Sequence, residues 1–200
     1  MVLANSAESL RTSSVLKKVK VIILGPGLGQ EVWSRALFDL VIGLAQPKVV
    51  DADALRMLAE YPIKNSLWVL TPHPGEAAAL LSCSIAAVEA DRFAAVKKIA
   101  QQYGGICVLK GAGTLVSNGE TVWVNSTGNP GMASGGMGDV LSGIIGALIL
   151  QSADLFVAAR LGVYIHGRAA DIIAQKHGQI GLLASDLYPE IQRLINAESY

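Results

Sequence analysis

The chain has 200 residues, of which 52% are hydrophobic and 16% are charged, and its 16 basic and 16 acidic side chains give a formal net charge of zero. This length favours one domain with a substantial buried core, and the composition excludes a disordered chain. The balanced charge gives no electrostatic basis for binding nucleic acid or an anionic membrane surface, so a small-molecule partner is favoured.

The first residues, the longest apolar run and the cysteines predict a soluble cytoplasmic protein. The first residues lack the charged and long apolar regions of a secretion signal. The longest apolar run, 140–150, is interrupted by serine and glycine and is shorter than the ~20 residues that span a bilayer. Cys83 and Cys107 lack the C-x-x-C spacing of a metal site, and both are predicted to be reduced core residues.

Apolar runs of strand length alternate with amphipathic segments through the first half of the chain. After a short helix around 9–18, strands are predicted at 19–24, 47–51, 67–71 and 106–109, and helices at 30–44, 54–60, 76–81 and 85–103. Continuous apolar strands that alternate with helices are typical of a parallel sheet covered on both faces. The pattern predicts an α/β fold with three layers, α/β/α, and a mainly parallel sheet.

The second half continues with a hairpin and then with helices. Strands at 114–116 and 121–124 flank Asn118-Gly119, a strong signal for a hairpin turn. Helices are predicted at 137–151, 154–176 and 184–196. No repeat or linker interrupts the pattern, so residues 1–200 are predicted to form a single domain.

Unusual residues gather in the loops that follow the predicted strands. These loops are 25–29, 51–53, 71–76 and 110–114. Because the carboxyl ends of parallel strands meet at one edge of a sheet, we expect the four loops to lie together. This convergence predicts a ligand site.

The glycine-rich run 125–139 leads directly into an apolar helix. Glycines let the backbone approach a ligand closely, and the first amides of a helix have no partner within it, so this junction suits an anion. We expect the amides of Gly135, Gly136, Met137 and Gly138 to form the anion hole. Asp139 beside them suits a base that takes a proton from a hydroxyl attacking phosphorus. The alternative is that Asp139 only caps the helix.

Two further loops are open to a binding or a structural interpretation. The turn 25–29 resembles a dinucleotide fingerprint, but Gln30 stands where that pattern needs glycine. We interpret the turn as allowing close approach of a ligand, with a purely structural role as the alternative. His73 lies between two prolines, which fixes its imidazole at the ligand edge, although a lone histidine is usually structural. Glu76 is interpreted as a partner of the helix dipole.

Charged residues at the same edge have open roles. Lys110 begins a loop of small residues and can offer its charge to a phosphate, with a surface lysine at a hairpin as the alternative. Asp51 and Asp53 could help to hold Mg²⁺ through water, although capping of the next helix explains Asp53 equally well. No residues are assigned as direct metal ligands.

Taken together, the motifs are more specific than any one of them. The segments 25–29, 51–55, 71–76, 110–114 and 128–143 resemble, in order and spacing, the NAD(P)H-hydrate dehydratase family of the ribokinase-like superfamily. The resemblance implies an enzyme that phosphorylates the C6 hydroxyl of hydrated NADH or NADPH and then eliminates phosphate. It implies Mg²⁺ as cofactor and ADP as phosphoryl donor, because the His-Pro-Gly-Glu form of the 73–76 motif is similar to bacterial members; ATP is the alternative.

The resemblance also implies roles by position. Asp139 is the expected catalytic base. The expected contacts to the hydrate are Gly27, Gly29, His73 and Asp139. The expected adenine-nucleotide site consists of Lys110, Gly111, Ala112, Gly113, Thr114 and Gly138.

The family usually carries a further segment that nothing in this chain matches. We therefore expect the chain to be the C-terminal part of a longer module. The resemblance further implies a homotetramer and an epimerase domain in the same or a separate chain. Two alternatives stay open: a kinase of the same superfamily acting on a hydroxymethylpyrimidine or a thiazole alcohol, and a non-catalytic nucleotide-binding fragment.

Overall fold

The computed structural model describes residues 16, 18–152 and 154–196, and most of the helix predicted around 9–18 lies outside them. The strands form one six-stranded sheet in the order β1-β2-β3-β4-β5-β6. The first four strands are parallel, and β5 and β6 are antiparallel to their neighbours, which confirms the mainly parallel sheet. The bounds are β1 Ile22–Leu24, β2 Lys48–Val50, β3 Trp68–Leu70, β4 Ile106–Leu109, β5 Leu115–Ser117 and β6 Val122–Val124.

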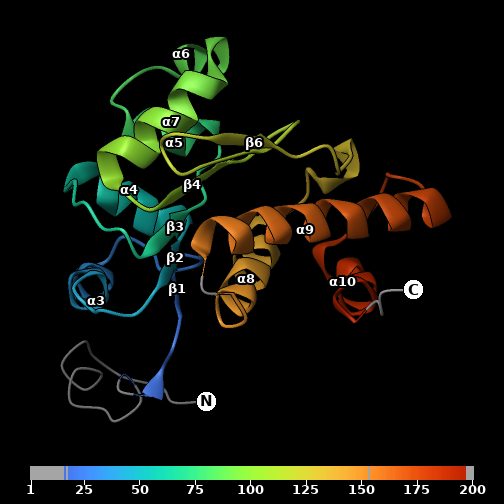
Figure 1. Ribbon diagram of the computed structural model, residues 1–200, viewed down its shortest axis with the longest axis horizontal. Coiled ribbons are helices and arrows are strands. Elements are labelled where there is room, and N and C mark those ends of the chain that lie inside the picture. The colour runs from blue at the N-terminus through green and yellow to red at the C-terminus, as the bar shows by residue number, and fades with distance from the viewer. Residues whose placement is uncertain (1–15, 17, 153, 197–200) are drawn as a thin grey trace.

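Helices cover both faces of this sheet (Figure 1). One face is covered by α3 (Val32–Ile42), α4 (Ala52–Glu60), α5 (Pro74–Leu80) and α7 (Arg92–Tyr103), with α6 (Ile85–Ala90) beside α5. The other face is covered by α8 (Met137–Ile149) and α9 (Leu155–His177), and α10 (Leu187–Ile195) packs on α9. Short 3₁₀ turns, η1 (Pro130–Met132) and η2 (Ala184–Asp186), complete the described elements. The predicted three-layer arrangement is confirmed.

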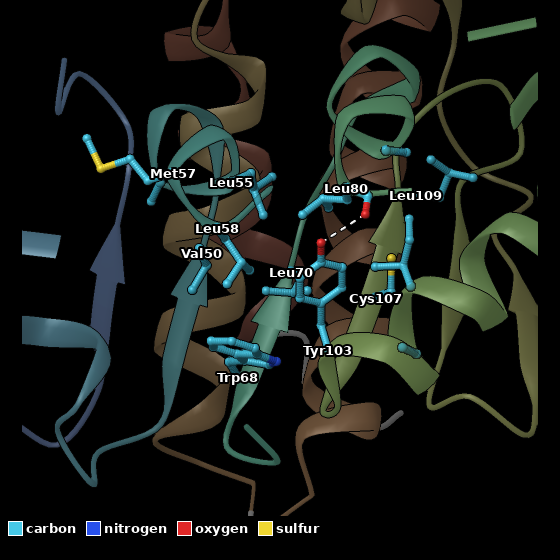
Figure 2. Close-up of a cluster of buried hydrophobic side chains, with 14 of the residues drawn as sticks. Val50, Leu55, Met57, Leu58, Trp68, Leu70, Leu80, Tyr103, Cys107 and Leu109 are labelled. Atoms are coloured by element: carbon cyan, nitrogen blue, oxygen red, sulfur yellow. Dashed lines mark hydrogen bonds between the residues drawn. The ribbon is translucent and has the colours of Figure 1, made fainter. Parts of the chain in front are cut away.

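The central strands β2, β3 and β4 are buried along their whole length because each of their faces packs against a helical layer. Val49 and Val50 are both fully buried, and they belong to the cores on opposite faces of the sheet. In the core beneath α4, α5 and α7, the Tyr103 hydroxyl donates a hydrogen bond to the carbonyl of Leu80 at 2.9 Å (Figure 2). This bond satisfies the phenol without leaving the apolar layer and ties α7 to the end of α5.

Two predicted helices are interrupted in the structure. The helix predicted over 85–103 is two helices, because Asp91 ends α6 and its carboxylate accepts a hydrogen bond from the amide of Ala94 as the N-cap of α7. The helix predicted from 184 begins as the 3₁₀ turn η2 before α10. The strands β1, β2 and β3 are also shorter than predicted, because an apolar run extends beyond the residues that pair with a neighbouring strand, whereas β4 has its predicted bounds.

The prediction for the cysteines was right for one and wrong for the other. Cys107 in β4 is fully buried, and burial raises the pKa of its thiol. Cys83 is exposed. It follows Ser82, which has a φ of +51°, in the turn between α5 and α6, and such a connection lies on the surface.

None of the helices in the described ranges combines the length and the apolar character needed to cross a bilayer.

Candidate functional site at the carboxyl edge of the sheet

The loops that follow the parallel strands meet at one edge of the sheet, as predicted. The Asp51 amide donates to the carbonyl of Leu24 at 3.0 Å, which joins the ends of β2 and β1. The Lys110 amide donates to the carbonyl of Pro72 at 2.8 Å, which joins the ends of β4 and β3. Four segments that are far apart in the sequence therefore line one edge.

The ammonium group of Lys110 lies between two buried carboxylates. Its Nζ atom is 2.8 Å from Asp51 Oδ1 and 3.7 Å from Glu76 Oε2. Asp51 is 1% exposed, and its other oxygen accepts a hydrogen bond from the Ser142 hydroxyl of α8 at 2.8 Å. A Cβ atom built on Gly138 would lie 3.5 Å from Lys110 Nζ. Lys110 therefore lies directly below the first turn of α8 and is not a surface lysine, although its loop does join the β4–β5 hairpin.

His73 has a structural contact and also faces the site. Its Nδ1 atom accepts a hydrogen bond from the amide of Gly75 at 3.0 Å and caps α5, while the Glu76 carboxylate accepts from the His73 amide at 2.8 Å. Because Nδ1 is an acceptor, these hydrogen bonds assign the proton of the neutral ring to Nε2, which lies 3.3 Å from Glu76 Oε1. The His73 side chain is 51% exposed. Its cap fixes the ring while leaving it accessible.

The glycine turn after β1 is held by both shape and hydrogen bonds. Gly25 has a φ of +126°, and a Cβ atom there would lie 1.7 Å from the Asp51 carbonyl oxygen, so only glycine fits. The Gly29 amide donates to Asp53 Oδ2 at 2.8 Å. Asp53, which lies in the first turn of α4, therefore stabilises the glycine loop 25–29 through this hydrogen bond. The structural interpretation of Gly25 is supported.

The first turn of α8 presents its amides without a capping side chain. Gly136 is the N-cap in the left-handed region, with a φ of +83°, and it makes no side-chain cap hydrogen bond. The intrahelical ladder begins with the Val140 amide, which donates to the carbonyl of Gly136 at 3.0 Å, so the amides of residues 137–139 have no partner within the helix. Asp139 lies in this turn and is exposed.

Helical spacing gives the direction of Asp139. It lies two turns before Gly146, and residues seven apart share a face. A Cβ atom on Gly146 would lie 2.9 Å from the Ile23 side chain of β1. Asp139 therefore lies on the β1 side of α8, the side on which the glycine turn follows β1.

A cavity of about 870 Å³ opens beside Lys110 and the first turn of α8. It takes in every residue predicted to bind the nucleotide, together with Met137 of the predicted anion hole and His73, a predicted contact to the hydrate. The predicted nucleotide residues are Lys110, Gly111, Ala112, Gly113, Thr114 and Gly138. Other predicted site residues are not among the described residues that line it: Gly27, Gly29, Gly135, Gly136 and Asp139. The cavity and the β1 side thus lie on two sides of Gly138.

The sequence reasoning missed the wall that α9 contributes. Val163, His166 and Gly167 line the cavity, together with the segment 125–130. The segment 125–130 belongs to the glycine-rich run that the sequence analysis predicted to approach a ligand. The α9 residues carry no local signal of binding, because small and apolar residues in a long helix are typical of packing.

His166 places an uncharged imidazole in this wall. It is 6% exposed, and burial lowers its pKa to about 4, against a smaller effect from a hydrogen bond to the backbone of Met137. Its Nε2 atom and the hydroxyl of Ser134, which also lines the cavity, are buried without a hydrogen-bond partner in the described part of the chain. Both are free to bond with a ligand or with water.

Arg92 was also missed, and it supports the loop that begins with Lys110. Its guanidinium donates to the carbonyl of Ala112 at 2.6 Å and to those of Leu109 and Lys110 at 3.4 and 3.3 Å. A guanidinium can hold several carbonyls at once because its donors form a rigid fork. No local pattern indicates this contact, because Arg92 lies inside the helix predicted over 85–103.

Across the described ranges, no group of three or more histidine, cysteine, aspartate or glutamate side chains is arranged to hold a metal ion. The carboxylates of Asp51 and Glu76 lie on either side of Lys110. Magnesium in nucleotide sites is usually held by one or two carboxylates together with phosphate oxygens and water. These two residues therefore fit a cation that arrives with a nucleotide and do not form a cage of their own.

Comparison with known proteins identifies the family. The family model described as NAD(P)H-hydrate dehydratase matches residues 1–193. The chain is 53% identical, over 88% of its length, to a bifunctional NAD(P)H-hydrate repair enzyme of Vibrio cholerae, of which it spans 35%. It is 40% identical, over 98% of its length, to the ADP-dependent (S)-NAD(P)H-hydrate dehydratase of Neisseria meningitidis, of which it spans 68%. The chain thus spans about a third of the bifunctional relative.

Solved structures agree with this assignment. The ADP/ATP-dependent NAD(P)H-hydrate dehydratase of Bacillus subtilis, crystallised with ATP and Mg²⁺ and soaked with coenzyme A, superposes with a TM-score of 0.78 at 31% identity over 88% of this chain and 65% of that one. A hydroxyethylthiazole kinase of Pyrococcus horikoshii, at 19% identity and a TM-score of 0.76 over 96% of this chain and 78% of that one, shares the fold. The predicted ribokinase-like fold is confirmed, and the chain belongs to the NAD(P)H-hydrate dehydratase family.

Proposed function

We propose that this chain catalyses the ADP-dependent dehydration of the S-epimer of NAD(P)H hydrate and so regenerates NADH or NADPH. The names of its relatives support this activity. The observation that carries the proposal is the meeting of a large cavity, the ammonium of Lys110 and an uncapped helix start beside Asp139. These are the parts that phosphoryl transfer to a hydroxyl requires.

The cavity is the proposed site of the adenine nucleotide. Its wall from Lys110 to Thr114 and its floor at Gly138 hold the phosphates, because the ammonium and the free amides of α8 both attract negative charge. The neutral His166 and the apolar Val163 also line the cavity and suit the uncharged parts of the nucleotide. Mg²⁺ bound with the nucleotide, near Asp51 and Glu76, would neutralise charge on the phosphates.

The hydrate is proposed to bind on the β1 side of Gly138. There it would contact Gly27 and Gly29, and also His73, which lines the cavity as well. Asp139 would accept the proton of the C6 hydroxyl. The hydroxyl oxygen then bonds to the terminal phosphorus of ADP as the bond to AMP breaks. The amides of residues 135–138 would hold the charge that develops on the phosphoryl oxygens.

Elimination follows because phosphate is a far better leaving group than hydroxide. The lone pair of the ring nitrogen expels phosphate, and loss of the neighbouring ring proton restores the double bond of the reduced nicotinamide. A homotetramer, a cytoplasmic location, a companion epimerase domain and the place of this domain within a longer module stay part of the proposal.

Recovery of reduced-nicotinamide absorbance tests the activity. The purified chain is incubated with the S-hydrate of NADH, ADP and Mg²⁺, with matched reactions that lack ADP or contain ATP instead. We expect recovery that depends on ADP and releases AMP and phosphate. A stable phosphorylated hydrate would indicate a kinase instead, and ADP binding without turnover would indicate a non-catalytic fragment.

A further inference from the structure

One wall of the cavity is a segment with little regular structure. Residues 125–130, with Met132 and Ala133, line the cavity, and the segment contains only the short turn η1. It runs from the end of β6 to the start of α8 alongside α9 (Figure 1). A wall of this kind defines a binding site only if contacts from outside hold its backbone, because ordering free backbone on binding costs conformational entropy.

Asp171 of α9 provides such a contact. Its Oδ2 atom accepts a hydrogen bond from the amide of Gly128 at 2.9 Å, and its Oδ1 atom accepts from the side-chain amide of Asn129 at 3.0 Å. The Asn129 side chain in turn accepts from the amide of Gly131 at 3.0 Å. One carboxylate thus holds two successive loop residues and, through Asn129, the turn η1. Asp171 is not among the described residues that line the cavity.

A glycine in α9 lets the loop come close enough to reach Asp171. Gly167 lies one turn before Asp171 on the same helical face. A Cβ atom on Gly167 would lie 2.3 Å from the Thr127 hydroxyl and 2.9 Å from the Gly128 amide nitrogen. The loop backbone therefore rests on the helix backbone, and the Thr127 hydroxyl donates to the carbonyl of Tyr164 at 3.2 Å.

We propose that Asp171 is a positioning residue for the adenine nucleotide, acting through the loop 125–133. By accepting the Gly128 amide and the Asn129 side chain on the helix side, it fixes which groups of the loop face the cavity. Hydrogen bonds to an ionised carboxylate are stronger than neutral ones, so a single side chain can hold this part of the wall. The inference rests on the proposed function for the identity of the ligand.

ADP titration of matched variants tests the inference. Asp171→Ala removes both hydrogen bonds, and we expect the ADP dissociation constant to rise about tenfold or more, because the loop must then be ordered on binding. Asp171→Asn keeps one acceptor oxygen, and we expect a smaller rise. Asp154→Ala is the control: this carboxylate caps the start of α9, at the amides of Phe156 and Val157, and we expect ADP affinity to stay unchanged.

Steady-state kinetics separate positioning from a general loss of structure. For Asp171→Ala we expect the KM for ADP to rise while kcat at saturating ADP and the KM for the hydrate stay near those of the unaltered chain. Thermal melting of each variant checks that it folds. If Asp171→Ala does not fold, the rise in the ADP dissociation constant of Asp171→Asn decides.

The inference would be overturned by unchanged ADP affinity in the folded Asp171 variants. An equal loss of affinity in Asp154→Ala would overturn it as well, because the effect would then belong to α9 as a whole. Failure of the proposed function gives a different result: the unaltered chain would bind ADP but not convert the hydrate, and the comparison of dissociation constants would still stand. No ADP binding by the unaltered chain would contradict both.

Discussion

Single residues at the carboxyl edge serve two purposes at once, and Lys110 is the clearest case. Its ammonium completes a buried polar cluster with Asp51, and it also lines the cavity. A buried carboxylate is tolerated when it is paired and hydrogen-bonded, and Asp51 is held by Lys110, Ser142 and the amide of Ala52. The charge that would meet a phosphate is therefore already fixed in place before any ligand binds.

His166 makes stability depend on pH. Its pKa is about 4 in the folded chain, against about 6.5 in an unfolded chain. Between these values the unfolded chain binds more protons, so this contribution to stability is fully present above about pH 6.5 and falls as the pH decreases toward 4. At a pH below 4, the unfolding free energy is lower by roughly 3 kcal/mol than it is above pH 6.5 because of this one group.

Unfolding measured between pH 4 and 7 checks this dependence. We expect His166→Gln to flatten the pH dependence of the unfolding free energy, and His177→Gln, at an exposed position, to leave it unchanged. Equal pH slopes for His166→Gln and the unaltered chain would show that this imidazole is not the group that titrates.

At this scale the sequence predicted the residues that follow strands and missed those that act from helices. Lys110 and His73 were found because each comes directly after an apolar strand, where parallel strands bring loops together. His166 and Asp171 reach the site from the middle of α9. Their spacing is that of any packed helix, so no local pattern distinguishes them.

At the scale of elements, α8 and α9 form a closely packed pair on one face of the sheet. Gly162 of α9 allows this approach, since a Cβ atom there would lie 2.7 Å from Cγ1 of the buried Ile145. Gly143 of α8 has nothing within 4 Å of its Cβ position. A methyl group therefore fits at Gly143 but not at Gly162.

Alanine substitutions measure this difference. Gly143→Ala gains helix propensity, and we expect it to raise the unfolding free energy by up to about 1 kcal/mol. Gly162→Ala overpacks the contact, and we expect it to lower the unfolding free energy by about 1–2 kcal/mol. Denaturant unfolding of both variants gives the two values. Stabilisation by both substitutions would mean that α8 and α9 are not in close contact at Gly162.

Within the described residues the predicted elements were right in kind and order, and their errors have physical causes. The break at Asp91 is set by a side chain that caps a new helix, which the apolar stripe of 85–103 conceals. The break also matters for the site, because it begins α7 at Arg92, whose guanidinium holds the loop after β4. The hairpin of β5 and β6 was predicted within one residue by its Asn118-Gly119 turn.

Over the whole molecule, our proposal places the two ligands on different sides of the start of α8. The cavity lies where the β4–β5 loop faces α9, and the glycine turn after β1 lies on the other side of the α8 helix start. The mainly parallel sheet could be predicted because its first four strands are nearly continuous apolar runs that alternate with helices. The proposed division between a nucleotide side and a hydrate side could not be predicted. It depends on the direction in which each residue of the first turn of α8 points.

Turnover by Asp139→Asn, measured with the S-hydrate of NADH, ADP and Mg²⁺, tests the central claim most directly. Asparagine keeps the size of the side chain but cannot accept the hydroxyl proton, so we expect turnover to fall by about 10²–10⁴-fold while ADP binds at least as tightly as before. Turnover within about threefold of the unaltered chain would contradict the role of Asp139 as the base, and with it the proposed mechanism.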